Sequence, residues 1–284
     1  MAGSERPFGL DGPLGCWRVQ DRLVLAYALL TLPVLALGAA RGVPGCRAQA
    51  AVSLAVLAGV PLLARLSRDT RSRLLTALRL FCAPLLYWVF YHQAQTLWPV
   101  LRAAPLDGPL AALEGRLWGL QPSLAFGAAL PQRWVSELFC AAYFAYYLFV
   151  PVLGLATLCV RGYAAAERLL AAATGCMLSC YALFWLFPTV GPHYWFAPGR
   201  GPQLYDGYVF NHLLFFFTSG GEIRGGAFPS SHIALALLLT LLLLPAVVYL
   251  RAHYLLDVPA GLLTGLLAYA LAARQGFLEK LKPI

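Results

Sequence analysis

The sequence predicts an all-α polytopic membrane protein, a helical bundle of about six to eight spans with a short extracytoplasmic cap. Of its 284 residues, 60% are hydrophobic and 12% are charged, whereas a soluble domain is about 45–50% apolar and about 25% charged. The apolar runs are rich in Leu and Ala and lack the period-two alternation of barrel strands. Helices are therefore expected, since only helices and closed barrels satisfy backbone hydrogen bonds within lipid.

Apolar segments long enough to cross a bilayer mark the candidate spans. They lie at about 23–40, 48–64, 74–91, 136–160, 169–188, 232–250 and 254–273. We divide the chain into an N-terminal tail (1–22), N-terminal spans with an interfacial segment (23–135) and a C-terminal core (136–284). The residues LALGAARG after the first segment resemble a cleavage site, so removal of that segment as a signal peptide is an alternative.

Basic residues between the spans predict the orientation of the chain, because such links face the cytoplasm. They are Arg6, Arg18 and Arg22; Arg65, Arg68, Arg71, Arg73 and Arg79; Arg161 and Arg168; Arg274, Lys280 and Lys282. The N-terminal tail is then cytoplasmic, and residues 92–135 and 189–231 lie outside the cytoplasm. All four groups on one side require an even number of crossings, which conflicts with the seven apolar segments.

Charge and cysteine content exclude two further classes of function. The net charge of +9 comes from links between apolar runs, and no polar basic groove suited to nucleic acid is present in the sequence. The seven cysteines form no CxxC pair, and most lie inside apolar runs. Cys176 and Cys180 are one helical turn apart, but we interpret them as packing residues. No metal site and no cofactor are predicted.

The two external stretches differ from simple loops. Residues 105–134 contain Pro, Gly and charged side chains, which suggests short amphipathic helices at the membrane interface. Residues 188–228 are rich in Gly, Pro and aromatic residues and also carry polar groups, which makes them the expected place for a functional site. Those polar residues are His193, Arg200, Asp206, His212, Glu222 and Arg224.

The sequence FPSSH at 228–232 directly precedes an apolar run. Ser230, Ser231 and His232 would therefore stand at a helix N-terminus, where unpaired backbone N–H groups favour an anion. Serine hydroxyls add hydrogen-bond donors, and His232 can carry a proton near neutral pH. Helix capping alone would explain one serine.

A second motif, HYLLD, occupies residues 253–257 and follows Arg251. His253 and Asp257 are four residues apart, so they meet on one face of a helix. A carboxylate bonded to one imidazole nitrogen leaves the other nitrogen free to attack an electrophile. A structural His–Asp hydrogen bond between helices is the alternative.

Together the two motifs resemble those of the type-2 phosphatidic acid phosphatase superfamily, which has a Pro-Ser-Gly-His block and a later His-xxx-Asp block with an arginine. Ser231 stands here in the place of that glycine. The longer context is most similar to the inositol phosphorylceramide synthase-like branch. The supporting stretches are LFPTVGPHYWF at 186–196, GGAFPSSH at 225–232 and VYLRAHYLLDVPAG at 248–261, with weaker support from 113–123 and 136–147.

The resemblance implies that residues 136–284 form a phosphatase/phosphotransferase-like core that acts on a lipid phosphate or phosphodiester without metal. His253 would attack phosphorus to form a phosphohistidine, with Asp257 orienting its ring. His232 would protonate the leaving oxygen and then activate water or an alcohol. Ser230, Ser231 and an arginine would bind the phosphate oxygens.

Two phosphate contacts of the family have no direct equivalent in this sequence. The lysine of its first motif is absent around residues 187–196, where His193 or Arg200 would substitute. The arginine expected six residues before the nucleophile falls on Val247, and Arg251 lies one helical turn later.

Only residues 233–252 separate the two histidines. A single helix over this interval would rise about 30 Å, one bilayer thickness, and would hold the histidines apart. Either Pro245 breaks the run into a short re-entrant pair, or one span is missing and the site is incomplete. The function is then that of a membrane phosphatase or phosphotransferase, or of an inactive lipid-binding or scaffold relative. A transporter is a weaker third class, since no inverted repeat is visible in the sequence.

Overall fold

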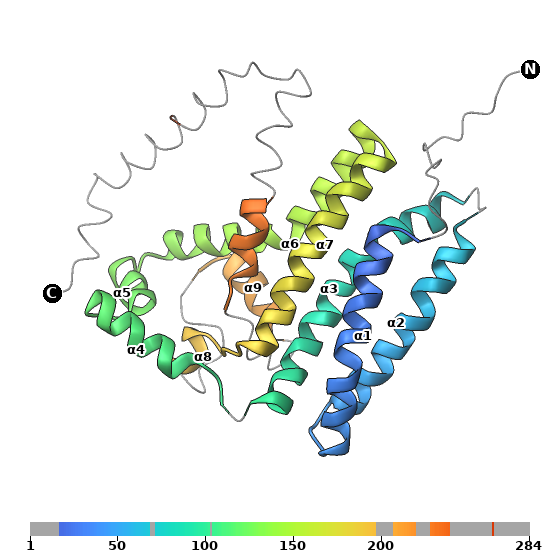
Figure 1. Cartoon of the computed structure of the whole chain (residues 1–284). Helices are drawn as coiled ribbons and strands as arrows, with labels where there is room; N and C mark the ends of the chain where they lie inside the picture. Colours follow the sequence, from blue (N-terminus) through green and yellow to red (C-terminus); the bar gives the residue numbers. More distant parts are fainter. Residues whose placement is uncertain are drawn as a thin grey trace, which may run out of the picture.

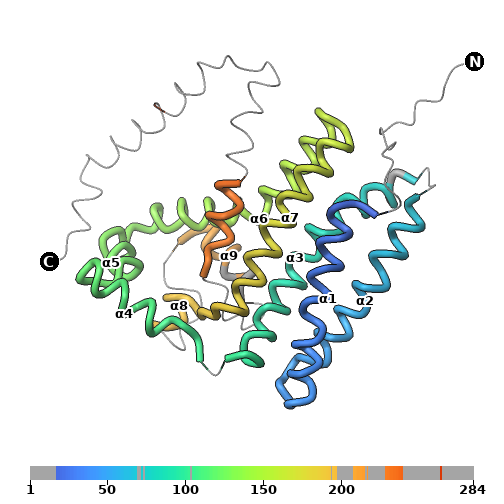
Figure 2. Tube along the Cα trace, viewed as in Figure 1, coloured from blue at the N-terminus to red at the C-terminus, as the bar shows by residue number. Residues whose placement is uncertain are grey.

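The structure is a computed structural model that describes residues 17–68, 72–102, 104–196, 207–219, 228–238 and 263. All regular secondary structure in these ranges is helical, which confirms the predicted all-α class (Figures 1 and 2). The helices are α1 (Val19–Ala40), α2 (Cys46–Leu66), α3 (Arg73–Leu101), α4 (Asp107–Trp118), α5 (Pro122–Ala129), α6 (Arg133–Arg161), α7 (Tyr163–Leu186), α8 (Pro192–Phe196) and α9 (Phe210–Ser219). One more helical stretch covers residues 231–238.

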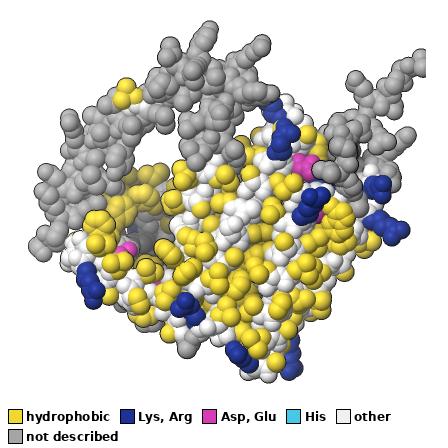
Figure 3. Space-filling model, viewed as in Figure 1, with side chains coloured by type: hydrophobic (Ala, Val, Ile, Leu, Met, Phe, Trp, Pro, Cys, Tyr) yellow, Lys and Arg dark blue, Asp and Glu magenta, His cyan; other side chains and the backbone are white. Residues whose placement is uncertain are grey.

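Five described helices are long and apolar enough to cross a membrane: α1, α2, α3, α6 and α7. They correspond to the first five predicted spans, so the chain is a multi-pass membrane protein. Hydrophobic side chains cover a large part of the described surface in Figure 3, as expected for a surface in contact with lipid. The predicted span 232–250 is described only as far as 238, and 254–273 only at Leu263.

The helices begin earlier than the apolar runs that predicted them. α1 starts at Val19 rather than at residue 23, and α7 starts at Tyr163 rather than at residue 169. The added turn of α1 contains Gln20 and Asp21, which are both buried. Hydropathy alone ends a predicted span at such polar residues. It cannot show that a neighbouring helix supplies partners for them, so the predicted start is too late.

α7 is the central helix of the described bundle and packs against α1, α3 and α6. In its most apolar stretch 56% of the residues are buried, whereas the corresponding share of α6 is 11%. Its buried face includes Tyr181, Phe184 and Trp185. Residues of α6 are therefore available on the outside of the described bundle to receive other parts of the chain.

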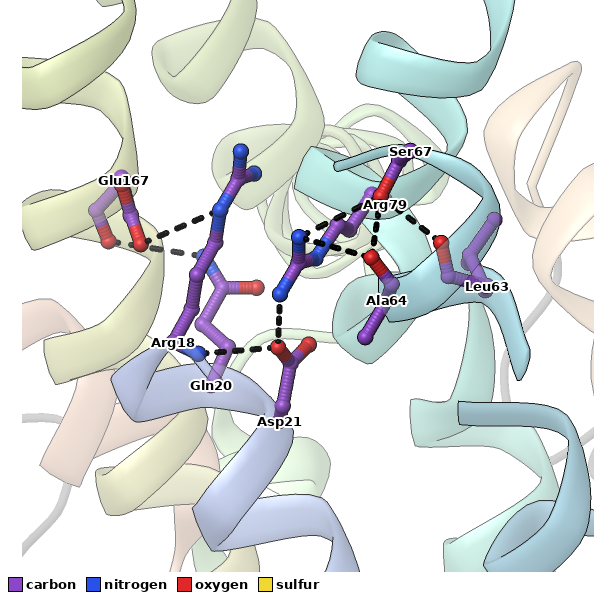
Figure 4. A network of polar contacts seen from close by, with 8 residues as sticks. All are labelled: Arg18, Gln20, Asp21, Leu63, Ala64, Ser67, Arg79 and Glu167. Carbon is purple, nitrogen blue, oxygen red and sulfur yellow. Dashed lines mark hydrogen bonds and ion pairs between the residues drawn. The ribbon is translucent and has the colours of Figure 1, made fainter. Parts of the chain in front are cut away.

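A polar network joins the ends of four helices (Figure 4). The Arg79 guanidinium of α3 forms an ion pair with Asp21 of α1 and donates to Ser67 Oγ at 3.2 Å, beyond the end of α2. Arg18, just before α1, lies 3.7 Å from Glu167 of α7. Arg79 is itself buried, so it belongs to the bundle interior rather than to the basic link between α2 and α3.

This network places the start of α1, the end of α2 and the starts of α3 and α7 at one end of the bundle. The described residues of three predicted basic groups therefore lie at that end, in agreement with their predicted common orientation. The helices α4, α5 and α8 lie in the connections that leave the opposite ends of α3 and α7 (Figure 1). Short helices between α3 and α6 were predicted from residues 105–134, and α4 and α5 confirm them.

The short helices α4, α5, α8 and α9 form the cap, and two carboxylates attach it to the bundle. Asp107 of α4 is buried and accepts hydrogen bonds from the backbone N–H groups of Val190 and Gly191, both at 2.8 Å. The backbone N–H of Leu106 also donates to the Pro188 carbonyl at 2.7 Å. The chain between α7 and α8 is thereby tied to the first turn of α4.

The second carboxylate belongs to Glu137, near the start of α6. It accepts four backbone N–H groups, from Tyr208, Val209, Phe210 and Asn211, at 2.6 to 3.3 Å. These are the orphan donors at the N-terminus of α9, and a negative charge is favourable there. Glu137 thus caps α9 and holds it against α6.

Candidate functional site

Residue Ser230 caps the helical stretch 231–238. Its hydroxyl oxygen accepts the backbone N–H of Ile233 at 3.4 Å, and its carbonyl accepts the N–H of Ala234 at 3.0 Å. The residue itself is exposed. The predicted placement of FPSSH at a helix N-terminus is therefore correct, and capping is one function of the first serine.

Ser231 faces the bundle and is 7% exposed. Its Oγ lies 3.4 Å from the hydroxyl of Tyr146 on α6, which donates to it. The same tyrosine hydroxyl is 3.3 Å from the sulfur of Met177 on α7. The motif is thus attached directly to α6, and through Tyr146 it is linked to α7.

His232 lies against two aromatic rings of α6. Its ring centroid is 4.0 Å from that of Tyr146 and 4.3 Å from that of Tyr143, with both pairs tilted by about 35°. The Nε2 atom is buried and has no hydrogen-bond partner among the described residues. A ring held by stacking, with one nitrogen left uncommitted, can exchange a proton with a bound molecule.

The position of this site along the bundle follows from its partners. Tyr143 and Tyr146 belong to the half of α6 nearer Arg133, and Met177 belongs to the half of α7 nearer Leu186. Those ends carry the cap, and the opposite ends carry the charge network. His232 therefore lies toward the cap, with the 231–238 helix beside α6 and α7 in Figure 1.

Of the predicted site residues, the structure brings together Ser230, Ser231 and His232. His193 lies on α8, and only its backbone is described. The remaining predicted site residues lie outside the described ranges: Arg200, Arg251, His253 and Asp257. Their roles remain predictions.

The sequence reasoning missed Tyr143, Tyr146 and Met177. A usable signal was present in SELFCAAYFAYY at 136–147, where Tyr143 and Tyr146 are three residues apart and so share a helix face. Nothing in that spacing shows which chain segment packs on the face. Only the contact with His232 gives the two tyrosines a place in the site.

The described residues contain no group of three His, Cys, Asp or Glu side chains that could hold a metal ion. Cys176 and Cys180 on α7 are free thiols. The chemical groups assembled here are an imidazole, the exposed Ser230 hydroxyl and the N-terminus of a helix. They suit the binding of an oxyanion and the transfer of a proton.

Comparison with known families indicates a coarse class of function. Residues 109–245 match the family described as the PAP2 superfamily, the type-2 phosphatidic acid phosphatases. This match supports the resemblance of the chain to the PAP2 superfamily. The match runs from α4 through the FPSSH motif and ends at Pro245, before HYLLD. No curated protein and no solved structure matches the chain.

Similarity to the PAP2 superfamily supports a phosphatase or phosphotransferase type of function on lipid phosphates. The matched region includes α4, α5 and the start of α6, which the sequence analysis had grouped with the N-terminal part. The inositol phosphorylceramide synthase-like branch stays a prediction from the resemblance.

Proposed function

We propose that this protein is a membrane enzyme that moves the phosphoryl group of a lipid phosphate or phosphodiester through a phosphohistidine. The observation that carries the proposal is His232, held on two tyrosine rings at a helix N-terminus with its Nε2 uncommitted. His253 is the nucleophile and Asp257 orients it. The site faces the extracytoplasmic side.

The proposed reaction has two steps. A nitrogen of His253 bonds to phosphorus, the bond from phosphorus to the leaving oxygen breaks, and His232 gives that oxygen its proton. His232 then takes a proton from the acceptor hydroxyl, whose oxygen bonds to phosphorus and frees His253. Water as the acceptor makes the protein a phosphatase, and a lipid alcohol makes it a phosphotransferase.

The negative charge that develops on the phosphate oxygens needs hydrogen-bond donors in both steps of the reaction. The N-terminus of the 231–238 helix and the Ser230 hydroxyl supply them from the described part of the site. Arg251 and either His193 or Arg200 complete the proposed set. Because guanidinium binds two phosphate oxygens at once, an arginine at this position would also orient the substrate.

The test is hydrolysis of dioctanoyl phosphatidate, together with headgroup exchange, by the purified full-length chain. We expect His232→Ala and His253→Ala each to lower kcat by about a thousandfold or more, as loss of a catalytic group does. His212→Ala is the matched control, because His212 is an exposed histidine on α9. Activity that survives His253→Ala would exclude the proposed nucleophile.

A specific observation favours a second function, that of an inactive relative that binds lipid. Only residues 233–252 separate the two histidines, and the family match ends inside this interval. A cysteine pair at positions 232 and 253, in a background without other cysteines, separates the two functions. Linkage by a reagent that spans about 8 Å supports the enzyme, because one helical crossing would separate these positions by about 30 Å.

A further inference from the structure

The two serines of the FPSSH motif differ in exposure, and the side chain of the second, Ser231, is turned away from the exposed N-terminus of the helix. Ser230 is exposed at the helix N-terminus, whereas Ser231 is buried against α6. The Ser231 hydroxyl is paired with the Tyr146 hydroxyl. Two adjacent serines of the same motif therefore have different surroundings and different partners.

Tyr146 contacts two consecutive residues of the motif at once. Its ring packs on the His232 ring, and its hydroxyl reaches Ser231 Oγ at 3.4 Å and Met177 Sδ at 3.3 Å. Because α6 and α7 pack on each other, this one side chain connects the start of the 231–238 helix to a rigid pair of spans. Tyr143 holds the same imidazole through its ring alone.

We propose that Tyr146 and Ser231 form a positioning pair that sets the orientation of His232, an inference that rests on the proposed function. The Ser231–Tyr146 hydrogen bond fixes the rotation of the helix that carries His232, and the Tyr146 ring fixes the plane of the imidazole. Ser231 then acts through Tyr146 and His232 rather than as a phosphate ligand. A small displacement of a proton-transfer group can lower the rate by about a hundredfold.

The experiment compares Ser231→Ala, Tyr146→Phe and the double variant in dioctanoyl phosphatidate hydrolysis. Each single variant removes the same hydrogen bond, so we expect kcat to fall about tenfold in each, with KM unchanged. The double variant should lose no more than either single variant, since coupled residues are not additive. Tyr146→Leu, which also removes the ring, should lose about a hundredfold.

The matched control is Tyr87→Phe on α3. Tyr87 hydrogen-bonds Thr174 of α7 at 3.0 Å, one turn before Met177. This variant therefore removes another tyrosine hydroxyl bond to the same helix without touching the motif. We expect its kcat to stay within about twofold of the wild-type value. An equal loss of kcat in Tyr87→Phe would show that the effect of Tyr146→Phe comes from general helix packing. That result would overturn the inference.

Two outcomes separate this inference from the proposed function. A raised KM in Ser231→Ala, with wild-type behaviour of Tyr146→Phe, would make Ser231 a phosphate ligand and refute the positioning pair alone.

Lack of activity in the wild type would refute the proposed function. The pair is then tested by the rate at which diethylpyrocarbonate modifies His232, mapped by mass spectrometry. We expect this rate to rise severalfold in both single variants, and an unchanged rate would refute the pair.

Discussion

At the scale of single residues, Arg79 shows how a charge is kept inside this apolar bundle. Its guanidinium is 5% exposed and is paired with the Asp21 carboxylate and with oxygens of Ala64 and Ser67. Such a pair adds little over two apolar residues of similar size, but removal of one partner leaves the other charge buried and uncompensated. The pair therefore selects one packing of α1 on α3.

Arg79→Ala should destabilise the protein by about 3–5 kcal/mol, the usual result of breaking a buried ion pair. The measurement is thermal unfolding in detergent micelles. Arg22→Ala is the control, since Arg22 carries the same charge beside Asp21 in sequence but is exposed. It should change stability by less than about 0.5 kcal/mol. If Arg79→Ala and Arg22→Ala changed stability equally, the network around Arg79 would have no structural function.

At the scale of elements, two carboxylates attach the cap to the bundle. Asp107 holds the chain before α8, and Glu137 holds the start of α9. Gly191 belongs to the first of these attachments and has φ of 90°, which favours glycine. The cap is thus fixed at both ends of the segment 192–207 by side chains from α4 and α6.

Asp107→Ala should lower the free energy of unfolding by about 2–3 kcal/mol, because two backbone N–H groups lose charged acceptors and one of them is buried. Thermal unfolding measures the change. Glu114→Ala removes the same charge from the same helix, where no backbone clamp of this kind is described, and should have a much smaller effect. A similar loss in both would assign the effect to α4 itself.

Glu137→Ala should free the start of α9. Amide hydrogen exchange, followed by mass spectrometry on peptides that include residues 208–211, should become faster, since these N–H groups lose their acceptor. Glu137→Gln keeps one acceptor oxygen and should give an intermediate rate. Protection that survives Glu137→Ala would mean that other contacts hold α9.

At the scale of the whole molecule, the charge network and the His232 site lie toward opposite ends of the bundle. The network contains the starts of α1, α3 and α7, whereas the site lies toward the cap. With basic ends in the cytoplasm, the site faces the other side. This sidedness is a prediction from charge distribution.

Single cysteines in a background without other cysteines test the sidedness. Gln132→Cys, directly before α6, should react with a membrane-impermeant maleimide added from the extracytoplasmic side. Ala164→Cys, exposed in the first turn of α7, should react only after the membrane is permeabilised. The reverse pattern would place the His232 site on the cytoplasmic side and contradict the proposed location.

The sequence by itself determined the all-α membrane class, the first five spans, the short helices of the cap and the resemblance to the PAP2 superfamily. Length, hydropathy and motif spacing are local properties, so they can be obtained from the chain without knowing its contacts. The sequence also placed Ser230, Ser231 and His232 correctly at a helix N-terminus.

Only the tertiary structure decided which residues surround that motif. The Asp21–Arg79 pair joins positions 58 residues apart, and Tyr146 meets Ser231 across 85 residues. Such pairs depend on how helices pack, which no local pattern contains. For the same reason Ser231, which the sequence analysis assigned to phosphate, has a tyrosine of α6 as its described partner, because the rotation of the 231–238 helix directs its hydroxyl into the bundle.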